Sequence, residues 1–423
     1  MRELSVDIAV IGGGPAGLAA ALEAARLGKS AAIVERADEL GGILMQCIHD
    51  GFGLMRFGKS MSGCAYAQRF IDELEEARAA GASIEVLLDT MVIELTADRT
   101  IWASNAEGMV RISAGAVVLA MGCRERTAAQ ILLQGERPQG VITAGAAQRY
   151  INIEGYLPGT RAVILGSGDI GLIMARRMKL EGIEVEGVYE VMDRPGGLAR
   201  NIAQCLDDYG IPLHLSHMVS EVHGRPRLTG VTVAERGADG RPVPGTERFV
   251  DCDLLVLAVG LIPENELSRG CGIELDPVTR GPILDESWMT SVPGIFAAGN
   301  VSIVYDLVDY VSESGELAAR GAAAWLDAGS PAGPFAYRPL ERAGNVGACV
   351  PQRIRTDAGA ERELRIFCRV RESCGKARMS LFSKGESLAK KGLGAVAPAS
   401  MLSFSACLPQ DAEPVLEIGR AHV

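Results

Sequence analysis

A six-residue glycine pattern that occurs twice in the 423-residue chain limits its fold more than any other feature. The pattern reads Gly12-Gly-Gly14-Pro-Ala-Gly17 near the start and Gly166-Ser-Gly168-Asp-Ile-Gly171 further along. Each copy follows a short apolar segment, residues 6–11 or 161–165, and precedes a helical stretch and a second apolar segment. Such a strand, glycine turn, helix and strand form a βαβ unit. Its repetition predicts an α/β fold with two doubly wound, Rossmann-like parallel sheets.

An acidic residue ends the second strand of each unit. Glu35 follows Gly17 by 18 residues, and Glu190 follows Gly171 by 19. A carboxylate at about this spacing binds a ribose hydroxyl, while the glycines let the backbone approach a pyrophosphate at a helix N-terminus. Because a 2′-phosphate beside Glu190 would be repelled, the second site is expected to take NAD(H) rather than NADP(H).

Further strands that end in glycine close both blocks. Residues 115–122 close the first block, residues 253–260 close the second, and residues 290–300 contain another such strand. The Gly/Pro-rich residues 329–334 then predict a linker. Beyond it, short apolar runs alternate with polar turns over residues 353–404, which predicts a small β-rich C-terminal domain.

The composition excludes several classes of protein. The 42 Lys and Arg residues are outnumbered by 53 Asp and Glu residues, so no nucleic-acid partner is expected. No run of 18 apolar residues occurs, so no transmembrane segment is expected. Glu3 and Asp7 stand where a secretion signal would have its basic and apolar regions. We therefore expect a cytoplasmic protein.

The ten cysteines predict neither a disulfide framework nor a metal site. No CxxC pair occurs, whereas zinc and iron–sulfur sites usually show close, repeated pairs. Buried or idle thiols of a reducing compartment are the expected interpretation. A four-cysteine cluster in the C-terminal region is the alternative, although its spacing is poor: Cys349, Cys368, Cys374 and Cys407.

The order of these motifs resembles that of the pyridine-nucleotide–disulfide oxidoreductase superfamily. Its members are flavoproteins with two dinucleotide-binding domains. The resemblance covers about residues 4–330 and includes the doublet Gly41-Gly42. It implies FAD at the first glycine pattern, a nicotinamide nucleotide at the second, and an NAD(H) domain inserted into the FAD domain. The expected boundaries are 1–155 with 265–330 for the FAD domain, 156–264 for the NAD(H) domain and 331–416 for the β-rich domain.

The resemblance also implies which residues hold the cofactors. In the family the late strand usually ends in Gly-Asp, and the aspartate binds the flavin ribitol. Here the pair is Gly299-Asn300, so the hydrogen-bonding capacity stays and the charge is lost. The residues expected at FAD are Gly12, Gly14, Pro15, Ala16, Gly17, Glu35, Arg36, Gly42, Ala120, Gly122, Gly299 and Asn300. Those expected at NAD(H) are Gly166, Gly168, Ile170, Gly171, Glu190 and Gly260.

A narrower similarity rests on residues 41–53, 121–126, 166–177, 261–265 and 299–301. These runs resemble NAD(P)/FAD-dependent oxidoreductases that are encoded beside a glycerol-3-phosphate dehydrogenase-like flavoprotein and a small CxxC-rich protein. They are more distantly similar to the FAD/NAD subunits of hydrogen cyanide synthase, opine oxidase and sarcosine oxidase. The resemblance implies an electron-transfer subunit of a dehydrogenase complex, with those two proteins as partners and glycerol 3-phosphate or a 2-hydroxy acid as the partner's substrate.

Cys47 and His49 are the candidate catalytic residues, since their segment follows the Gly41-Gly42 doublet. Disulfide reductases place two cysteines beside the flavin, one of which attacks the substrate. Only Cys47 occurs in this segment, so a thioredoxin- or glutathione-type reductase is not expected. A thiolate at Cys47 or a proton-handling His49 would be useful beside a flavin. The alternative is that Cys47 only packs and His49 only hydrogen-bonds.

The expected function is hydride transfer between NAD(H) and FAD, with electrons passing to or from a partner subunit. One alternative is a self-contained NADH oxidase or peroxidase that uses Cys47. Another is a scaffold subunit whose FAD is structural.

Two further groups have open roles. Arg124, Glu125 and Arg126 follow the Gly122 turn and form either a phosphate or interface site or a solvated ion-pair cluster. Asp306 and Asp309 follow the late FAD motif, where a helix start could stabilise negative charge on a reduced flavin. A plain helix face is the other interpretation of these two aspartates.

The last seven residues, 417–423, match a peptide that common sequencing-adapter DNA can encode. We therefore expect them to be an artefact of sequencing and leave them out of the fold prediction.

Overall fold

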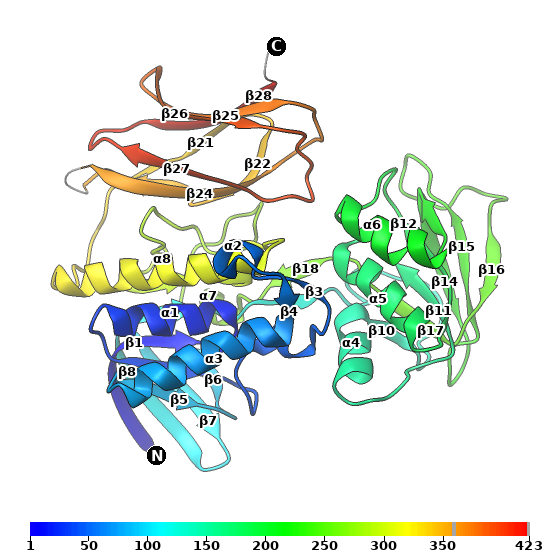
Figure 1. Cartoon of the computed structure of the whole chain (residues 1–423), viewed down its shortest axis with the longest axis horizontal. Coiled ribbons are helices and arrows are strands. Elements are labelled where there is room, and N and C mark those ends of the chain that lie inside the picture. The colour runs from blue at the N-terminus through cyan, green and yellow to red at the C-terminus, as the bar shows by residue number, and fades with distance from the viewer. Residues whose placement is uncertain (358–360, 421–423) are drawn as a thin grey trace. The chain divides into compact units, whose positions relative to one another are not determined.

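A computed structural model describes residues 1–357 and 361–420 and divides the chain into two compact units (Figure 1). Unit 1 comprises Met1–Cys123 and the chain from Pro263 onward, and unit 2 comprises Arg124–Ile262. The α/β class predicted from the glycine patterns is confirmed, because each unit contains a parallel sheet flanked by helices. The chain passes from one unit to the other at β9 (Cys123–Glu125) and β18 (Leu261–Pro263).

Unit 1 is built on a sheet of strand order β5-β2-β1-β8-β7-β6, with β19 paired to β8. Strands β5, β2, β1, β8 and β19 run parallel, whereas β6 and β7 form an antiparallel extension. Strands β2 and β19 and the C-terminal ends of β1 and β8 are buried on both faces, which explains the continuous apolar sequences there. The strands are β1 Arg2–Ile11, β2 Ala31–Val34, β3 Asp50–Phe52, β4 Met61–Ser62, β5 Ile84–Leu87, β6 Met91–Leu95, β7 Thr100–Asn105, β8 Gly108–Leu119 and β19 Ile295–Ala297.

Two helices pack closely in unit 1 because a glycine lies at their contact. Helix α1 meets helix α8 where a Cβ at Gly315 would lie only 2.1 Å from the backbone oxygen of Ala16. This contact brings the start of α8 to the glycine turn of residues 12–17. The helices are α1 Pro15–Arg26, α2 Leu54–Phe57, α3 Gly63–Ala79, α7 Glu266–Gly270 and α8 Val308–Asp327, with 3-10 turns at Gly42–Gln46 and Gly299–Val301.

Unit 2 contains a five-stranded parallel sheet of order β10-β17-β11-β12-β13 and a small antiparallel sheet, β14-β15-β16. The strands are β10 Val141–Thr143, β11 Arg161–Leu165, β12 Glu184–Glu190, β13 Leu213–Leu215, β14 His217–His223, β15 Gly230–Glu235, β16 Arg248–Asp251 and β17 Leu254–Leu257. The helices are α4 Ala144–Asn152, α5 Asp169–Leu180 and α6 Ala199–Cys205, with a 3-10 turn at Asp207–Tyr209.

The boundary of unit 2 lies earlier in the chain than the expected start at residue 156. Strand β10 pairs with β17, more than a hundred residues later, and the buried residues of α4 join the core of α5. Residues 124–155 therefore belong to unit 2. On the C-terminal side the division at Ile262 lies two residues before the expected end at 264.

The C-terminal part of unit 1 is β-rich, as predicted. Its strands form the sheets β21-β28-β25-β26 and β22-β24-β27 and the pair β20-β23 around an apolar core. Strand β28 runs through Glu417–Arg420, the first four residues of the suspected artefact, and Ile418 is buried there. Residues 421–423 of that segment lie outside the described residues. The strands are β20 Tyr337–Pro339, β21 Glu341–Gly344, β22 Val346–Val350, β23 Arg353–Arg355, β24 Arg362–Val370, β25 Ala377–Ser383, β26 Glu386–Leu393, β27 Leu402–Leu408 and β28 Pro414–Arg420.

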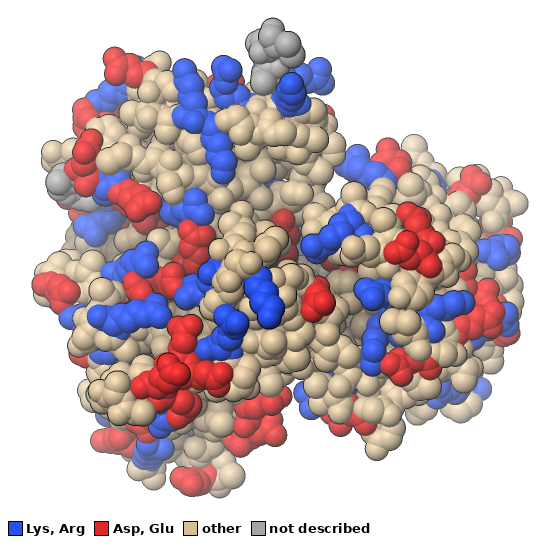
Figure 2. All heavy atoms as spheres, viewed as in Figure 1, with Lys and Arg blue, Asp and Glu red and all other residues tan. Residues whose placement is uncertain are grey.

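Charged side chains of both signs occur together on the surface. On the face drawn in Figure 2, Lys and Arg side chains are interspersed with Asp and Glu side chains. Among the helices of the described residues, none is long and apolar enough to cross a membrane.

Candidate functional site

The first glycine turn connects β1 to α1 at the carboxyl end of the unit 1 sheet. Gly12 has φ +108°, and a Cβ there would lie 2.5 Å from the backbone oxygen of Ala120. A Cβ at Gly17 would lie 1.8 Å from the oxygen of Gly12, so the helix can approach the turn only through a glycine. These two positions build the turn itself.

Gly14 has a different role, because a Cβ there would meet no atom within 4 Å. It precedes Pro15 at the start of α1, and no side chain caps this helix end. An uncapped helix start with open space before it fits a pyrophosphate group. Ala16 is buried behind the turn, and Pro15 is partly exposed at its rim.

The buried carboxylate of Glu35 lies beside the same turn. One of its oxygens accepts a hydrogen bond from the backbone N–H of Gly13 at 2.6 Å, and the other accepts one from Ala37 at 2.9 Å. Each oxygen keeps a lone pair for a further donor, such as a ribose hydroxyl. The turn and the carboxylate therefore fit the adenosine diphosphate half of a dinucleotide. Arg36, the next residue, is exposed.

The other residues expected at FAD follow neighbouring strands of the same sheet. Ala120 and Gly122 follow β8, and Gly299 and Asn300 follow β19. Because β1, β8 and β19 are parallel, these residues share the carboxyl edge with the glycine turn. Gly42 lies against it too, since a Cβ there would lie 3.1 Å from Cα of Gly14.

Asn300 bonds both to its own loop and to the residue at the start of β9. Its Oδ1 accepts a hydrogen bond from the backbone N–H of Tyr305 at 3.0 Å, and its Nδ2 donates to Sγ of Cys123 at 3.6 Å. The amide therefore shapes the loop before α8, a role that the sequence did not indicate.

The second glycine turn repeats the first in unit 2. Gly166 has φ +102°, and a Cβ there would lie 2.2 Å from the oxygen of Ala258. A Cβ at Gly171 would lie 2.5 Å from the oxygen of Gly166, whereas one at Gly168 would meet only Ala258 O, at 4.0 Å. Helix α5 begins at the next residue without a side-chain cap. The second turn therefore offers the same open helix start as the first. Ile170 is partly exposed and packs on the core of unit 2.

Glu190 takes the place that Glu35 has in unit 1, and it is likewise buried. One oxygen accepts hydrogen bonds from the backbone N–H and the hydroxyl of Ser167, at 2.9 and 2.6 Å. The other accepts one from the backbone N–H of Met192 at 2.9 Å. Ser167 is thus a site residue that the sequence analysis did not single out.

A second glycine doublet, Gly196-Gly197, also escaped the sequence analysis. Gly196 donates its N–H to the hydroxyl of Ser167 at 2.8 Å. Oδ1 of Asp169 accepts bonds from Leu198 N–H at 2.8 Å and Asn201 Nδ2 at 2.7 Å. These contacts hold the doublet and the start of α6 against the glycine turn.

The spacing of this doublet was the signal that could have revealed it. Gly41 lies six residues after Glu35, and Gly196 lies six residues after Glu190. In unit 1 the doublet is held by backbone alone, since Gly41 donates to the oxygen of Gly13 at 2.9 Å. In unit 2 the side chains of Ser167 and Asp169 hold the doublet, by accepting the backbone N–H groups of Gly196 and Leu198.

Cys47 and His49 lie on the segment after the first doublet. Cys47 is buried, its thiol donates to the oxygen of Ile43 at 3.3 Å, and the backbone of Gly63 packs against its Cβ. Nδ1 of His49 is 3.1 Å from the oxygen of Asp50. These contacts favour the packing and hydrogen-bonding interpretation of both residues.

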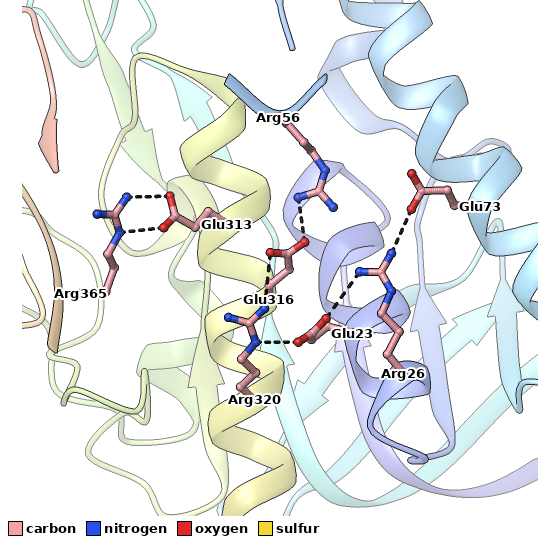
Figure 3. A network of polar contacts seen from close by, with 8 residues as sticks. All are labelled: Glu23, Arg26, Arg56, Glu73, Glu313, Glu316, Arg320 and Arg365. Carbon is pink, nitrogen blue, oxygen red and sulfur yellow. Dashed lines mark hydrogen bonds and ion pairs between the residues drawn. The ribbon is translucent and has the colours of Figure 1, made fainter. Parts of the chain in front are cut away.

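An ion pair ties the segment after Cys47 to α8, which is itself paired to α1 (Figure 3), and a cation–π contact ties the same segment to α3. Arg56 pairs with Glu316 of α8 at 2.7 Å, and its guanidinium lies 4.6 Å from the ring centroid of Phe70 in α3. Arg320 pairs with Glu23 of α1 at 2.6 Å. Because Arg56 and Glu316 are both largely buried, solvent screens their pair less than an exposed pair.

The Arg124–Arg126 group lies at the start of unit 2. Oε1 of Glu125 accepts the N–H of Gly145, in the first turn of α4, at 2.8 Å, so this carboxylate stabilises a helix start. Arg126 donates its backbone N–H to the oxygen of Gly260 at 3.0 Å, which places it at the carboxyl end of β17.

The C-terminal cysteines do not form a cluster in the described part of the chain. Cys349 of β22 faces Cys368 of β24, and burial raises the pKa of each thiol to about 12. Both therefore stay protonated near neutral pH. Within residues 1–357 and 361–420, no three His, Cys, Asp or Glu side chains are grouped so that they could hold a metal ion.

Comparison with known proteins agrees with this geometry. The family described as pyridine nucleotide-disulphide oxidoreductase matches residues 6–323. Hydrogen cyanide synthase subunit HcnB of Pseudomonas aeruginosa is 29% identical over 313 residues, which cover 69% of this chain and 66% of that protein. An opine oxidase subunit of Agrobacterium tumefaciens is 27% identical over 325 residues, covering 71% and 63%. The chain thus spans less than two thirds of either relative.

A solved structure shows the same fold. Thioredoxin reductase of T. acidophilum superposes with a TM-score of 0.61 at 24% identity, over 76% of this chain and 98% of that one. At this identity the likeness concerns the fold alone.

Proposed function

The chain belongs to the pyridine nucleotide-disulphide oxidoreductase family, and from this premise we propose that it transfers a hydride between NAD(H) in unit 2 and FAD in unit 1. It is an FAD-dependent NAD(P)H oxidoreductase of this family. The nicotinamide ring supplies or accepts the hydride and the flavin is its counterpart, so the protein's task is to bind and orient the two.

The observation that carries the proposal is that the same binding arrangement occurs once in each unit. We call it the dinucleotide cradle: the glycine turn, the helix start after it and the acid at the end of the next strand. Each unit has an uncapped helix start, open space around the glycine just before that helix (Gly14 or Gly168), and a buried carboxylate that can accept a further hydrogen bond. Gly14 and Glu35 would hold the diphosphate and a ribose of FAD, together with Gly299 and Asn300 along the neighbouring strand. Gly168 and Glu190 would hold the corresponding groups of the nicotinamide nucleotide.

Glu190 supports NAD(H) as the nucleotide of unit 2. Its carboxylate is buried and already accepts three hydrogen bonds. A 2′-phosphate at this position would place negative charge directly beside this buried carboxylate. A ribose hydroxyl would instead donate to the remaining lone pair.

We further propose that electrons pass between this chain and a partner subunit. The segment after the first doublet contains one cysteine, Cys47, and its thiol is buried and bonded to Ile43. An internal dithiol acceptor is therefore missing from this segment. HcnB and the opine oxidase relative are each named as subunits. A flavoprotein dehydrogenase acting on glycerol 3-phosphate or a 2-hydroxy acid, and a small CxxC-rich protein, are the proposed partners.

An anaerobic titration of the purified protein with NADH, followed by flavin absorbance, tests the hydride step. Bleaching at about one NADH per flavin, with slow turnover in air, supports the proposal. Steady NADH consumption with oxygen or peroxide would instead favour an oxidase or peroxidase. Bound flavin that NADH leaves oxidised, but that dithionite reduces, would contradict hydride transfer and favour a scaffold role. NADPH in a parallel titration tests the nucleotide choice.

A further inference from the structure

The loop that leads into α8 forms one wall of the proposed FAD site. It starts at Gly299, where a Cβ would lie 2.9 Å from Cβ of Ala16 in the first turn of α1. It continues through Asn300 and ends at Val308, the first residue of α8. The position of this loop therefore decides how Asn300 and the start of α8 lie relative to the first glycine turn.

Two polar side chains hold this loop to the C-terminal β-rich region. Arg369 of β24 donates to the oxygen of Val304 at 3.1 Å, and also to the oxygens of Pro398 and Ala399. Asp306 accepts the backbone N–H of Met401 at 2.7 Å. One guanidinium and one carboxylate thus join the loop of residues 300–307 to residues 398–401.

An aromatic contact supports the same junction. Phe367, two residues before Arg369 on β24, is fully buried. Its ring centroid lies 5.3 Å from that of Tyr305 and 5.2 Å from that of Tyr310. Both tyrosines flank the start of α8, so β24 supports the loop and the first turn of the helix together.

The start of α8 is also tied to the segment that follows Cys47 and His49. Oδ2 of the buried Asp309 accepts the backbone N–H of Met55 at 3.3 Å. Two aspartates three residues apart, Asp306 and Asp309, therefore anchor two different segments of the chain at one helix start. Neither carboxylate forms part of the plain helix face that the sequence allowed.

We propose that the β-rich region from residue 331 onward is a positioning element of the flavin site. Arg369, Phe367 and Asp306 fix the 299–309 segment, and this segment sets the affinity for FAD and the ease of its reduction. The inference rests on the proposed FAD site of unit 1. Its physical basis is that fixed backbone dipoles near a bound group change the stability of the group's charged form, while a loop free to move loses that effect.

Two variants test the proposal. Arg369→Ala removes the bonds to both loops, and Asp306→Ala removes the acceptor for Met401. Each is expected to raise the Kd of the apoprotein for FAD by about tenfold. Each should also shift the flavin midpoint potential and alter the visible circular dichroism of bound FAD. Asp306→Asn, which keeps an acceptor oxygen, should restore most of the wild-type values.

Arg338→Ala is the matched control, since the hydrogen-bond and ion-pair partners of the Arg338 side chain among residues 1–357 and 361–420 are Ala412 and Glu413, both of the β-rich region. It should leave the Kd, the potential and the spectrum unchanged. The inference would be overturned if folded Arg369→Ala and Asp306→Ala proteins bound FAD with a Kd within twofold of this control and had the same midpoint potential and spectrum. If Arg369→Ala does not fold, Asp306→Ala decides alone. All three readouts use FAD and dithionite without nucleotide, so a failure of NADH to bleach the flavin would refute the proposed function and not this inference.

Discussion

The hydroxyl of Ser167 donates to the carboxylate of Glu190 at 2.6 Å and accepts the N–H of Gly196 at 2.8 Å. This one side chain therefore joins the glycine turn of unit 2, the acid at the end of β12 and the second glycine doublet. In unit 1 the corresponding residue is Gly13, whose backbone N–H donates to the carboxylate of Glu35 and whose backbone oxygen accepts the N–H of Gly41. The two dinucleotide cradles share a plan and differ in how the doublet is held.

Ser167→Ala is expected to weaken NADH binding by about threefold to tenfold, because the doublet and Glu190 each lose a hydrogen bond. Titration calorimetry with NADH under anaerobic conditions measures the change, and the FAD content should stay at the wild-type level. Ser220→Ala, at a serine whose hydroxyl donates to Thr232 in the antiparallel sheet, is the control. Equal NADH affinity in both variants would contradict a role for Ser167.

Glu190→Arg is expected to weaken NADH binding and to improve NADPH binding, so that the ratio of the two Kd values changes by at least about tenfold. The cause is the exchange of a buried negative charge for a cation that can pair with a 2′-phosphate. Glu186→Gln, on the same strand, serves as the control, since Glu186 pairs with Arg161 outside the glycine turn. An unchanged nucleotide preference in Glu190→Arg would remove the assignment.

Gly14→Ala is expected to fold normally but to bind FAD at least about tenfold more weakly. A Cβ at Gly14 meets no atom of the chain within 4 Å, so the methyl group enters only the space expected for the pyrophosphate. Fluorescence titration of the apoprotein with FAD and a thermal melt without FAD separate these effects. Gly392→Ala, at an exposed glycine of β26 with equally open surroundings, should change neither. Full FAD affinity in Gly14→Ala would place the diphosphate elsewhere.

Stability should fall as the pH rises through the range in which Asp285 ionises. Burial, with a smaller contribution from Glu286, raises the pKa of Asp285 to about 6. The folded state therefore holds a proton between about pH 4 and pH 6 that the unfolded state has released. Ionised Asp285 thus costs up to about 3 kcal/mol of stability above pH 6, and this cost disappears below pH 4.

Asp285→Asn measures that cost. Its melting temperature relative to the wild type should rise between pH 4 and pH 7, because the amide never ionises. Asp411→Asn is the control: pairing with Lys384 lowers the pKa of that exposed carboxyl, so the melting temperature of this variant relative to the wild type should stay nearly constant between pH 4 and pH 7. A difference between Asp285→Asn and the wild type that does not change with pH would show that Asp285 keeps an ordinary pKa.

Local signals in the sequence were sufficient to predict where the two dinucleotide cradles lie. A glycine turn depends on a few consecutive residues, and the acid that completes it follows at a nearly constant distance. The parallel sheets and the β-rich C-terminal region could be predicted for a similar reason, because strand and helix periodicities are visible within short windows. The doublet Gly196-Gly197 was equally visible, through its spacing from Glu190, and was missed.

The tertiary structure alone decided the relationships between distant segments. The sequence indicated that Asp306 and Asp309 precede or begin a helix, but only the fold brings Met401 and Met55 to their carboxylates. The start of unit 2 at Arg124 likewise depends on β10 pairing with β17. Hydrophobic periodicity shows which face of an element is buried, whereas the partner that buries it is selected by packing among all elements at once. Residue types and local spacing thus determined the binding chemistry of this protein, and long-range packing determined which segments support it.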